Sequence, residues 1–343
     1  MAYTTINKPN TQMNTVLWTG DGSNPRSITG VGFQPDFTWL KRRSVDAYHF
    51  LTDSVRGVTE TIYSNINLAE QTQSLGLTAF GTDGFTVGSN ADVNGNTQTF
   101  VGWNWKAGGT ASSNTDGSIT TNASVNTTAG FSIVTFTGTG ANATIGHGLG
   151  VKPDAVFFKR LDTTGGWASY HSVLGATKYM RLDTNSGEQT ASDEFQNTEP
   201  TSSVISIGTD GAVNGTSMVA YCFAEKQGYS KFESYVGNGS TDGPFIFTGF
   251  KPAFVLIKKS NTSGTDWQLT DNKRDLHNVC THRLLPNDSI AEQTDSLDLD
   301  ILSNGFKIRK SSTTSNASGA TYIYLAFAEN PLVGTNNVPA TAR

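Results

Sequence analysis

The chain has 343 residues, of which 36% are hydrophobic, 10% aromatic and 15% charged, and its formal net charge is −5. The aromatic content argues against a disordered chain, and the acidic balance argues against the basic surface of a nucleic-acid-binding protein. There is neither a secretory signal nor an apolar run of membrane-spanning length, and two cysteines are too few for a disulfide framework, so we expect folding in a reducing cytoplasm.

A polar arm, residues 1–13, opens the chain, and an internal repeat follows it. Three prolines mark the repeat, and each lies 15 residues after the first glycine of a Gly-x-Gly turn (35 − 20, 153 − 138 and 252 − 237). The prolines are Pro35, Pro153 and Pro252, and the glycines are Gly20, Gly138 and Gly237. Strand-like segments and a Glu-Gln-Thr triplet follow each proline in the same order, so we infer three copies of one unit.

These anchors predict units at 14–107, 130–226 and 232–330, each near the usual size of a domain. The segment 108–129 is rich in Gly, Ser, Thr and Asn and is expected to be a linker, or to add an edge strand through Ile119 and Val125. The second junction is short, so the second and third units are expected to pack together directly. The polar tail, 331–343, is expected to be extended.

Short alternating segments predict that each unit is built from β-strands. Phe131–Phe136 is dense in β-branched and aromatic residues and too short for a helix. Phe37 and Trp39 lie on one face of their strand and Leu40 on the other, so this strand is expected to be covered on both sides. Asn-Gly and Asp-Gly pairs supply hairpin turns. The predicted fold is all-β, with three tandem β-sandwich, jelly-roll-like units and one short helical turn per unit, near 59–65 in the first.

The repeated Glu-Gln-Thr triplets begin at Glu70, Glu188 and Glu292. A glutamate acts as a general acid only beside a second group that tunes its pKa, and no partner carboxylate recurs at a fixed spacing. We therefore expect these triplets to bind the backbone of a loop.

One repeated position changes its residue type, from Asp53 to His171 to Asp271. A catalytic Ser-His-Asp group would need all three types to converge in one unit, with Ser54 or Ser172 as the nucleophile. Because the residue type changes between copies, we expect a surface loop here and no catalytic site.

Possible metal ligands are also better explained by structure. His277, Cys280 and His282 have zinc-like spacing but lack a clear fourth ligand, and Cys222 is expected to be a small core residue. Four aspartates in Gly-rich loops suit either calcium or ordinary turns: Asp21, Asp83, Asp210 and Asp242. We expect no metal and no cofactor.

Trp167 and Trp267 occupy corresponding places in the second and third copies, where the first copy has His49. Indole rings in loops can stack on sugars, so Trp167, Trp267 and the nearby His171 are the candidate glycan contacts. The alternative is that each ring closes the end of a sandwich.

Several segments resemble a repeat found in structural proteins of bacteriophages, especially those of aquatic phages. The similar segments are residues 31–41, 127–134 with 146–150, and 235–245, together with the two ends of the chain, 1–9 and 341–343. The resemblance implies a tail fibre or another virion structural protein and carries no catalytic motif.

The resemblance and the repeat together predict a non-enzymatic virion protein, assembled in the host cytoplasm and exposed as a tail fibre, spike or head decoration. Such a protein would serve host attachment or particle stability. Its expected partners are other virion proteins, reached through the N-terminal arm by strand addition, two further copies in a homotrimer, and a host surface glycan. We expect no nucleic-acid or membrane partner. The alternatives are a glycan-binding module and, less favoured, a capsule depolymerase.

Overall fold

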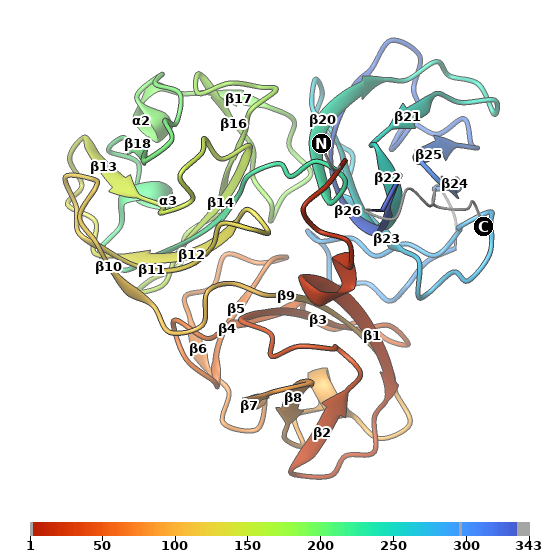
Figure 1. Ribbon diagram of the computed structural model, residues 1–343, viewed down its shortest axis with the longest axis horizontal. Helices are drawn as coiled ribbons and strands as arrows, with labels where there is room; N and C mark the ends of the chain where they lie inside the picture. The colour runs from red at the N-terminus through yellow and green to blue at the C-terminus, as the bar shows by residue number, and fades with distance from the viewer. Residues whose placement is uncertain (1–2, 295–296, 335–343) are drawn as a thin grey trace.

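A computed structural model describes residues 3–294 and 297–334 and confirms the all-β class, with 42% of residues in strands and 5% in helices. The chain forms three lobes around a common centre, and each lobe is one copy of the repeat (Figure 1). We call these lobes units 1, 2 and 3 in chain order. Among the described residues, no helix has the length and apolar character needed to cross a membrane.

Each unit contains an inner antiparallel sheet that faces the centre of the molecule. Its four shared strands have the orders β1-β9-β3-β4, β12-β19-β14-β15 and β20-β26-β22-β23. In unit 1 the sheet continues through β5 and β6, and in unit 2 it begins with β10 and β11. The bounds in unit 1 are β1 Met13–Thr19, β3 Phe37–Arg42, β4 Phe50–Asp53, β5 Glu60–Tyr63, β6 Gln71–Thr72 and β9 Thr99–Trp105. The bounds in unit 2 are β10 Ser112–Asn114, β11 Thr121–Asn126, β12 Phe131–Phe136, β14 Ala155–Arg160, β15 Ala168–His171 and β19 Met218–Phe223. The bounds in unit 3 are β20 Ser230–Val236, β22 Phe250–Lys259, β23 Gln268–Asp271 and β26 Thr321–Pro331.

A smaller outer sheet covers the other face of each inner sheet. The strand orders are β2-β8-β7 in unit 1, β13-β18 in unit 2 and β21-β25-β24 in unit 3, and unit 2 has a further pair, β16-β17. The bounds are β2 Arg26–Thr29, β7 Leu77–Gly81, β8 Gly84–Val87, β13 Ala143–Gly146, β16 Lys178–Tyr179, β17 Gln189–Thr190, β18 Val204–Ile207, β21 Phe245–Phe247, β24 Leu299–Leu302 and β25 Gly305–Ile308. The short helices are η1 Pro9–Thr11, α1 Ala91–Asn94, α2 Ser192–Phe195 and α3 Gly211–Asn214.

The strand β3 shows why both faces of the inner strands are apolar. Leu40 is fully buried in the core between the two sheets of unit 1, whereas Phe37 and Trp39 point into a second core at the centre of the molecule. The prediction of a strand covered on both sides is therefore confirmed.

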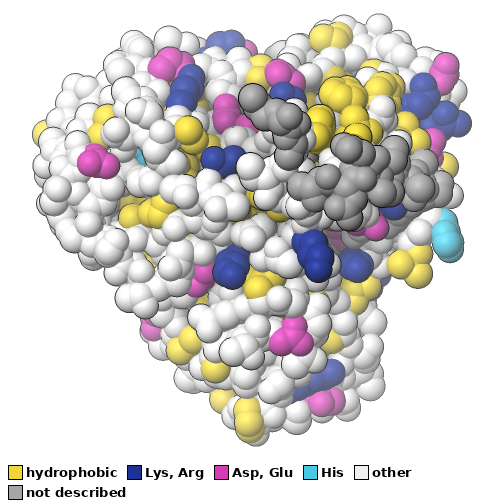
Figure 2. Space-filling model, in the orientation of Figure 1, with side chains coloured by type: hydrophobic (Ala, Val, Ile, Leu, Met, Phe, Trp, Pro, Cys, Tyr) yellow, Lys and Arg dark blue, Asp and Glu magenta, His cyan; other side chains and the backbone are white. Residues whose placement is uncertain are grey.

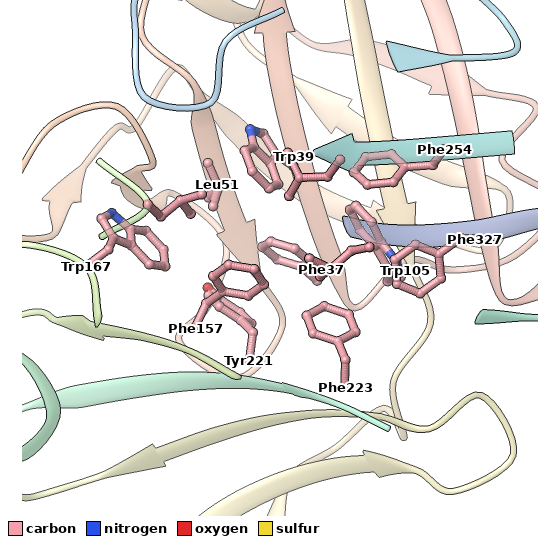
Figure 3. Close-up of a pocket in the computed structure, with 13 residues that line it drawn as sticks. Phe37, Trp39, Leu51, Trp105, Phe157, Trp167, Tyr221, Phe223, Phe254 and Phe327 are labelled. Carbon is pink, nitrogen blue, oxygen red and sulfur yellow. The ribbon is translucent and has the colours of Figure 1, made fainter. Parts of the chain in front are cut away.

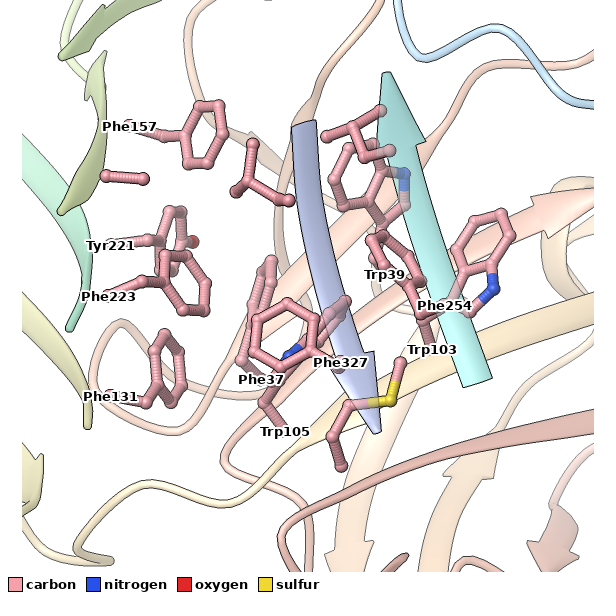
Figure 4. Close-up of a cluster of buried hydrophobic side chains, with 14 of the residues drawn as sticks. Phe37, Trp39, Trp103, Trp105, Phe131, Phe157, Tyr221, Phe223, Phe254 and Phe327 are labelled. Carbon is pink, nitrogen blue, oxygen red and sulfur yellow. The ribbon is translucent and has the colours of Figure 1, made fainter. Parts of the chain in front are cut away.

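The central core is built by all three inner sheets. Figure 4 shows aromatic side chains from the three units meeting there. Trp105 of unit 1 packs on Phe223 of unit 2, with ring centroids 6.4 Å apart, and on Phe327 of unit 3, at 5.7 Å. Phe223 and Phe327 also pack on each other, with ring centroids 5.8 Å apart. The three units thus share one core instead of lying in a row.

The segment expected to be a linker is folded, and the edge-strand alternative is the one the structure shows. Strands β10 and β11 pair with each other, and β11 pairs with β12. Ile119 also forms a parallel bridge to Ile145 of β13. The polar composition of this segment favoured a linker, because only Ala123 and Val125 of β11 pack into the core of unit 2.

The helical turn expected near 59–65 is wrong. This segment forms β5, in which Ile62 and Tyr63 pair with Leu51 and Phe50 of β4. Ile62 is fully buried in the central core, so tertiary packing decided the local conformation.

The first and last described segments of the chain both contact unit 3. The Tyr3 hydroxyl donates to the Gly249 carbonyl at 2.7 Å, and Ile6 is buried in the central core. The N-terminal arm from Tyr3 onward therefore packs on its own chain. At the other end, the Leu332 N–H donates to the same Gly249 carbonyl at 3.3 Å, and residues 335–343 of the predicted tail lie outside the described residues.

Candidate functional site

The Glu-Gln-Thr triplets join neighbouring units. The backbone N–H of each triplet glutamate donates to a carbonyl at the end of an inner strand in the next unit. Glu70 reaches Leu161 at 2.9 Å, Glu188 reaches Ser260 at 2.7 Å, and Glu292 reaches Arg43 at 2.8 Å. Because these contacts run from unit 1 to 2, from 2 to 3 and from 3 to 1, they close a ring. The triplets bind backbone, as predicted, but across unit boundaries.

A second set of backbone hydrogen bonds repeats around the ring. In each unit an N–H in the loop that joins β3 to β4, β14 to β15 or β22 to β23 donates to a carbonyl in the preceding unit. The pairs are Ala47 to Ser289 (2.8 Å), Gly165 to Asn67 (2.8 Å) and Gly264 to Asn185 (2.9 Å). All three unit boundaries therefore use the same backbone geometry, which is that of a threefold ring built within one chain.

Three buried lysines lie beside these contacts. Lys41, Lys159 and Lys258 are fully buried, and each Nζ donates to two backbone carbonyls. Lys41 reaches Ser289 of unit 3 and Lys258 reaches Asn185 of unit 2. Lys159 binds carbonyls of its own unit only, so Lys41 and Lys258 are the two that connect neighbouring units. Burial lowers the pKa of all three to about 8.

The position that changes from Asp to His is buried at the centre of the ring and does not lie on a surface loop, so that prediction is wrong. The Tyr221 hydroxyl of unit 2 donates to Asp53 Oδ2 at 2.7 Å, and Trp103 Nε1 of unit 1 donates to Asp271 Oδ2 at 3.0 Å. At the third boundary the facing residue is Leu325, which has no polar hydrogen to donate. There the acceptor is replaced by His171, whose Nε2 lies 3.4 Å from the Tyr324 carbonyl oxygen.

The same difference extends to the charges around this position. Arg56 pairs with Asp53 at 2.5 Å and with Glu70 at 2.6 Å, and Arg274 pairs with Asp271 at 2.6 Å and with Glu292 at 2.9 Å. Unit 2 has Leu174 in place of the arginine, and its Glu188 pairs instead with the partly exposed Lys178. Ser54, the candidate nucleophile of unit 1, donates to Asp36 Oδ1 at 3.1 Å.

The glycan contacts predicted at Trp167, Trp267 and His171 are wrong, because the three side chains are only 0%, 1% and 3% exposed. Trp167 Nε1 donates to the Tyr63 carbonyl of unit 1 at 2.8 Å, and Trp267 Nε1 donates to the Arg181 carbonyl of unit 2 at 3.0 Å. The indoles close unit boundaries, so no sugar can stack on them in this fold.

The other candidates also have structural roles. Cys280 is buried in the core of unit 3, and His282 Nδ1 lies 2.6 Å from Asp275 Oδ1. Burial raises the pKa of Cys222 to about 12, as befits a core thiol. In the part of the chain that the structure describes, no three His, Cys, Asp or Glu side chains group as a metal site.

The four loop aspartates act in turns or on the surface. Asp83 accepts from the N–H groups of Gly30 and Gly32, at 3.1 and 2.6 Å, and Asp210 caps α3 through the Ala212 N–H, at 2.7 Å. Asp21 accepts from the Ser23 N–H, and Asp242 pairs with Lys307.

An apolar cavity of about 20 Å³ lies in the central core (Figure 3). Its walls come from all three units, and they include Trp39, Trp167, Tyr221 and Phe327. The volume is near that of one water molecule and the walls offer no polar partners, so this cavity is a packing defect of the core and not a ligand site.

A polar groove of about 500 Å³ lies where unit 1 meets unit 2. Arg160, Arg181, Asp183 and Asp210 of unit 2 line it, together with Asn67 of unit 1. Its size falls in the range of small-molecule sites. Sequence reasoning missed it, although the signal was present in the places where unit 2 departs from the repeat.

The chain was compared with known protein families and with curated proteins. Residues 8–331 match the family model described as a domain of unknown function, DUF7483. The match runs through all three units, as the shared core leads one to expect. No curated protein matches the chain. The chain belongs to the DUF7483 family.

Proposed function

We propose that the protein is a non-enzymatic structural protein of a bacteriophage particle, exposed as a short appendage that serves host attachment or particle stability. Two placements stay open within this proposal: a tail fibre or spike, and a fibre or decoration on the head. The resemblance of residues 31–41 and their repeats to phage structural proteins supports the class.

The observation that carries the proposal is the use of the repeated polar residues. Glu70, Glu188 and Glu292 join the units, and Asp53 and Asp271 accept hydrogen bonds across unit boundaries. The residues that recur in the repeat are thus occupied in holding three sandwiches together. A shared aromatic core with hydrogen bonds across every unit boundary favours a rigid body, which suits a protein that must survive outside the cell.

The partners belong to the same proposal. Docking of the N-terminal arm on another virion protein would have to displace the contacts of Tyr3 and Ile6 with the rest of the chain. A homotrimer is proposed as well, although one chain already supplies a threefold arrangement. Light scattering tests it: a molar mass of three chains supports the trimer, and one of 36.6 kDa contradicts it.

Labelling of intact particles tests the function. A gold-tagged antibody against the protein is expected to bind purified particles at defined places seen by electron microscopy. Label at the tail tip would support host contact, and label over the head would support decoration. Absence of the protein from purified infectious particles, or release of oligosaccharide from host polysaccharide by the pure protein, would contradict the proposal.

A further inference from the structure

Three departures of unit 2 from the repeat meet in the polar groove. Each unit has a buried aromatic residue at the same place: His49 in unit 1, Trp167 in unit 2 and Trp267 in unit 3. The residue before it is Tyr48 in unit 1, Gly166 in unit 2 and Asp266 in unit 3. A Cβ atom on Gly166 would lie 3.3 Å from Asp183 Oδ2 and 3.5 Å from Arg181 Nη1. Both charged atoms therefore occupy the side of Gly166 where units 1 and 3 carry a side chain.

Asp183 is the second departure. In every unit a side-chain oxygen accepts the N–H of the buried ring residue: Asn65 from His49 at 2.9 Å, Asp183 from Trp167 at 3.1 Å, and Asn287 from Trp267 at 2.8 Å. An asparagine is sufficient for this structural role in units 1 and 3. The aspartate of unit 2 adds a second acceptor, Oδ2, where an asparagine would present an N–H donor.

Arg181 is the third departure, because the corresponding residues are Tyr63 and Leu285. Its guanidinium lies over the Tyr179 ring at 4.8 Å, and its Nη2 donates to Glu194 Oε1 at 3.1 Å. The Glu194 side chain is buried behind it. These contacts fix the orientation of the guanidinium while its Nη1 lies on the groove side of Gly166.

The rest of the groove also contains both donors and acceptors. Arg160 is held by Asp162 through two hydrogen bonds, at 2.7 and 3.0 Å, and Asp210 uses only Oδ1 to cap α3. Hydroxyls and an amide complete the lining: Thr164, Thr184, Ser186 and Gln189.

The charges that line the groove balance, with two guanidinium groups against two carboxylates. A phosphate or a polyanion would meet Asp183 and Asp210, and a peptide would need apolar pockets for its side chains, whereas Ala212 is the one apolar side chain in the lining. Sugar hydroxyls both donate and accept, so they match this lining. The corresponding hollow between units 3 and 1, where Tyr48 is present, has only about 260 Å³.

We propose that the groove formed by Gly166, Arg181 and Asp183 at the boundary of units 1 and 2 binds a neutral saccharide. This inference goes beyond the structural role proposed above and does not depend on it.

Saturation-transfer NMR with four neutral probes, maltotriose, cellotriose, mannotriose and chitotriose, tests the proposal on the full chain. At least one probe is expected to receive saturation. The variant Asp183→Asn carries the residue of units 1 and 3 and keeps the acceptor for Trp167, so it should fold normally and bind the probe at least tenfold more weakly. Gly166→Tyr restores the side chain of unit 1 and should abolish binding. Asp242→Asn makes the same chemical change on the exposed surface of unit 3 and should leave binding unchanged.

No signal from any of the four probes, or equal binding by the wild-type protein and both groove variants, would overturn the proposal. Stronger binding of trigalacturonate than of the neutral probes would overturn the assignment to neutral sugars. Because the protein's presence on particles is measured separately, failure of this test leaves the proposed structural function standing.

Discussion

At the scale of the residue, the hydrogen-bonding capacity of one side chain at each unit boundary matches the type of the residue that faces it. Where Tyr221 or Trp103 offers a hydrogen, the facing residue is an aspartate with a buried arginine beside it. Where Leu325 offers none, the aspartate is replaced by His171 and the arginine by Leu174. Burial lowers the pKa of His171 to about 4, so this histidine is neutral and the third boundary carries no buried charge at this position.

We predict that Arg56→Leu lowers the free energy of unfolding by about 3–5 kcal/mol, because removal of one member of a buried ion pair leaves the others unpaired. The side chain of Arg56 is 2% exposed and faces both Asp53 and Glu70. Urea titration measures the loss. The matched control is Lys178→Leu, which removes the partly exposed partner of Glu188 and should cost less than about 1 kcal/mol. An equal decrease in the free energy of unfolding in the two variants would show that the buried ion pairs of Arg56 contribute no more to stability than the partly exposed pair of Lys178.

At the scale of the element, the alternating strands were readable from the sequence, but the contacts between units were not. Phe37, Trp39 and Leu40 predict a strand with two apolar faces. The pattern does not show which part of the chain covers each face. The three anchor turns follow from close packing: a Cβ on Gly138 would lie 2.3 Å from the Gly215 carbonyl oxygen. The sequence offered an edge strand in 108–129 only as an alternative to a linker, and it did not predict the groove. In both places the polar residues find their partners on segments that are distant in sequence.

The strands β3, β14 and β22 contain the buried lysines, which predict an unusual dependence of stability on pH. The pKa of Lys41, Lys159 and Lys258 is about 8 in the folded chain and 10.5 in the unfolded chain. Between these values the unfolded state binds more protons, so stability should rise with pH above about 8. The rise in stability should end near pH 9–10. In this range Cys222 and Tyr229 lose their protons in the unfolded chain but keep them when they are buried in the folded chain, and this difference lowers stability as the pH rises.

Urea midpoints between about pH 7.5 and pH 9.5 measure this effect. The variant Lys41→Met should lose about one third of the rise, because it removes one of three equivalent groups. A midpoint that is constant or falls over this interval would show that the lysines are not desolvated.

At the scale of the whole molecule, we infer that the three repeats form one folding unit. Each inner sheet covers its outer sheet on one face and the shared aromatic core on the other (Figure 4). The space-filling view shows the three lobes in contact with one another (Figure 2). A unit cut from the ring would expose residues such as Phe131, Tyr221 and Phe223 to water, at a cost of about 1.5–3 kcal/mol for each large side chain.

Differential scanning calorimetry of the full chain shows whether the three repeats unfold together. If the ring is one cooperative unit, the calorimetric enthalpy of unfolding should equal the van't Hoff enthalpy, in a single transition that fluorescence and circular dichroism report at the same temperature. Three separable transitions, or a calorimetric enthalpy about three times the van't Hoff value, would show that the sandwiches fold independently and would contradict the closed ring.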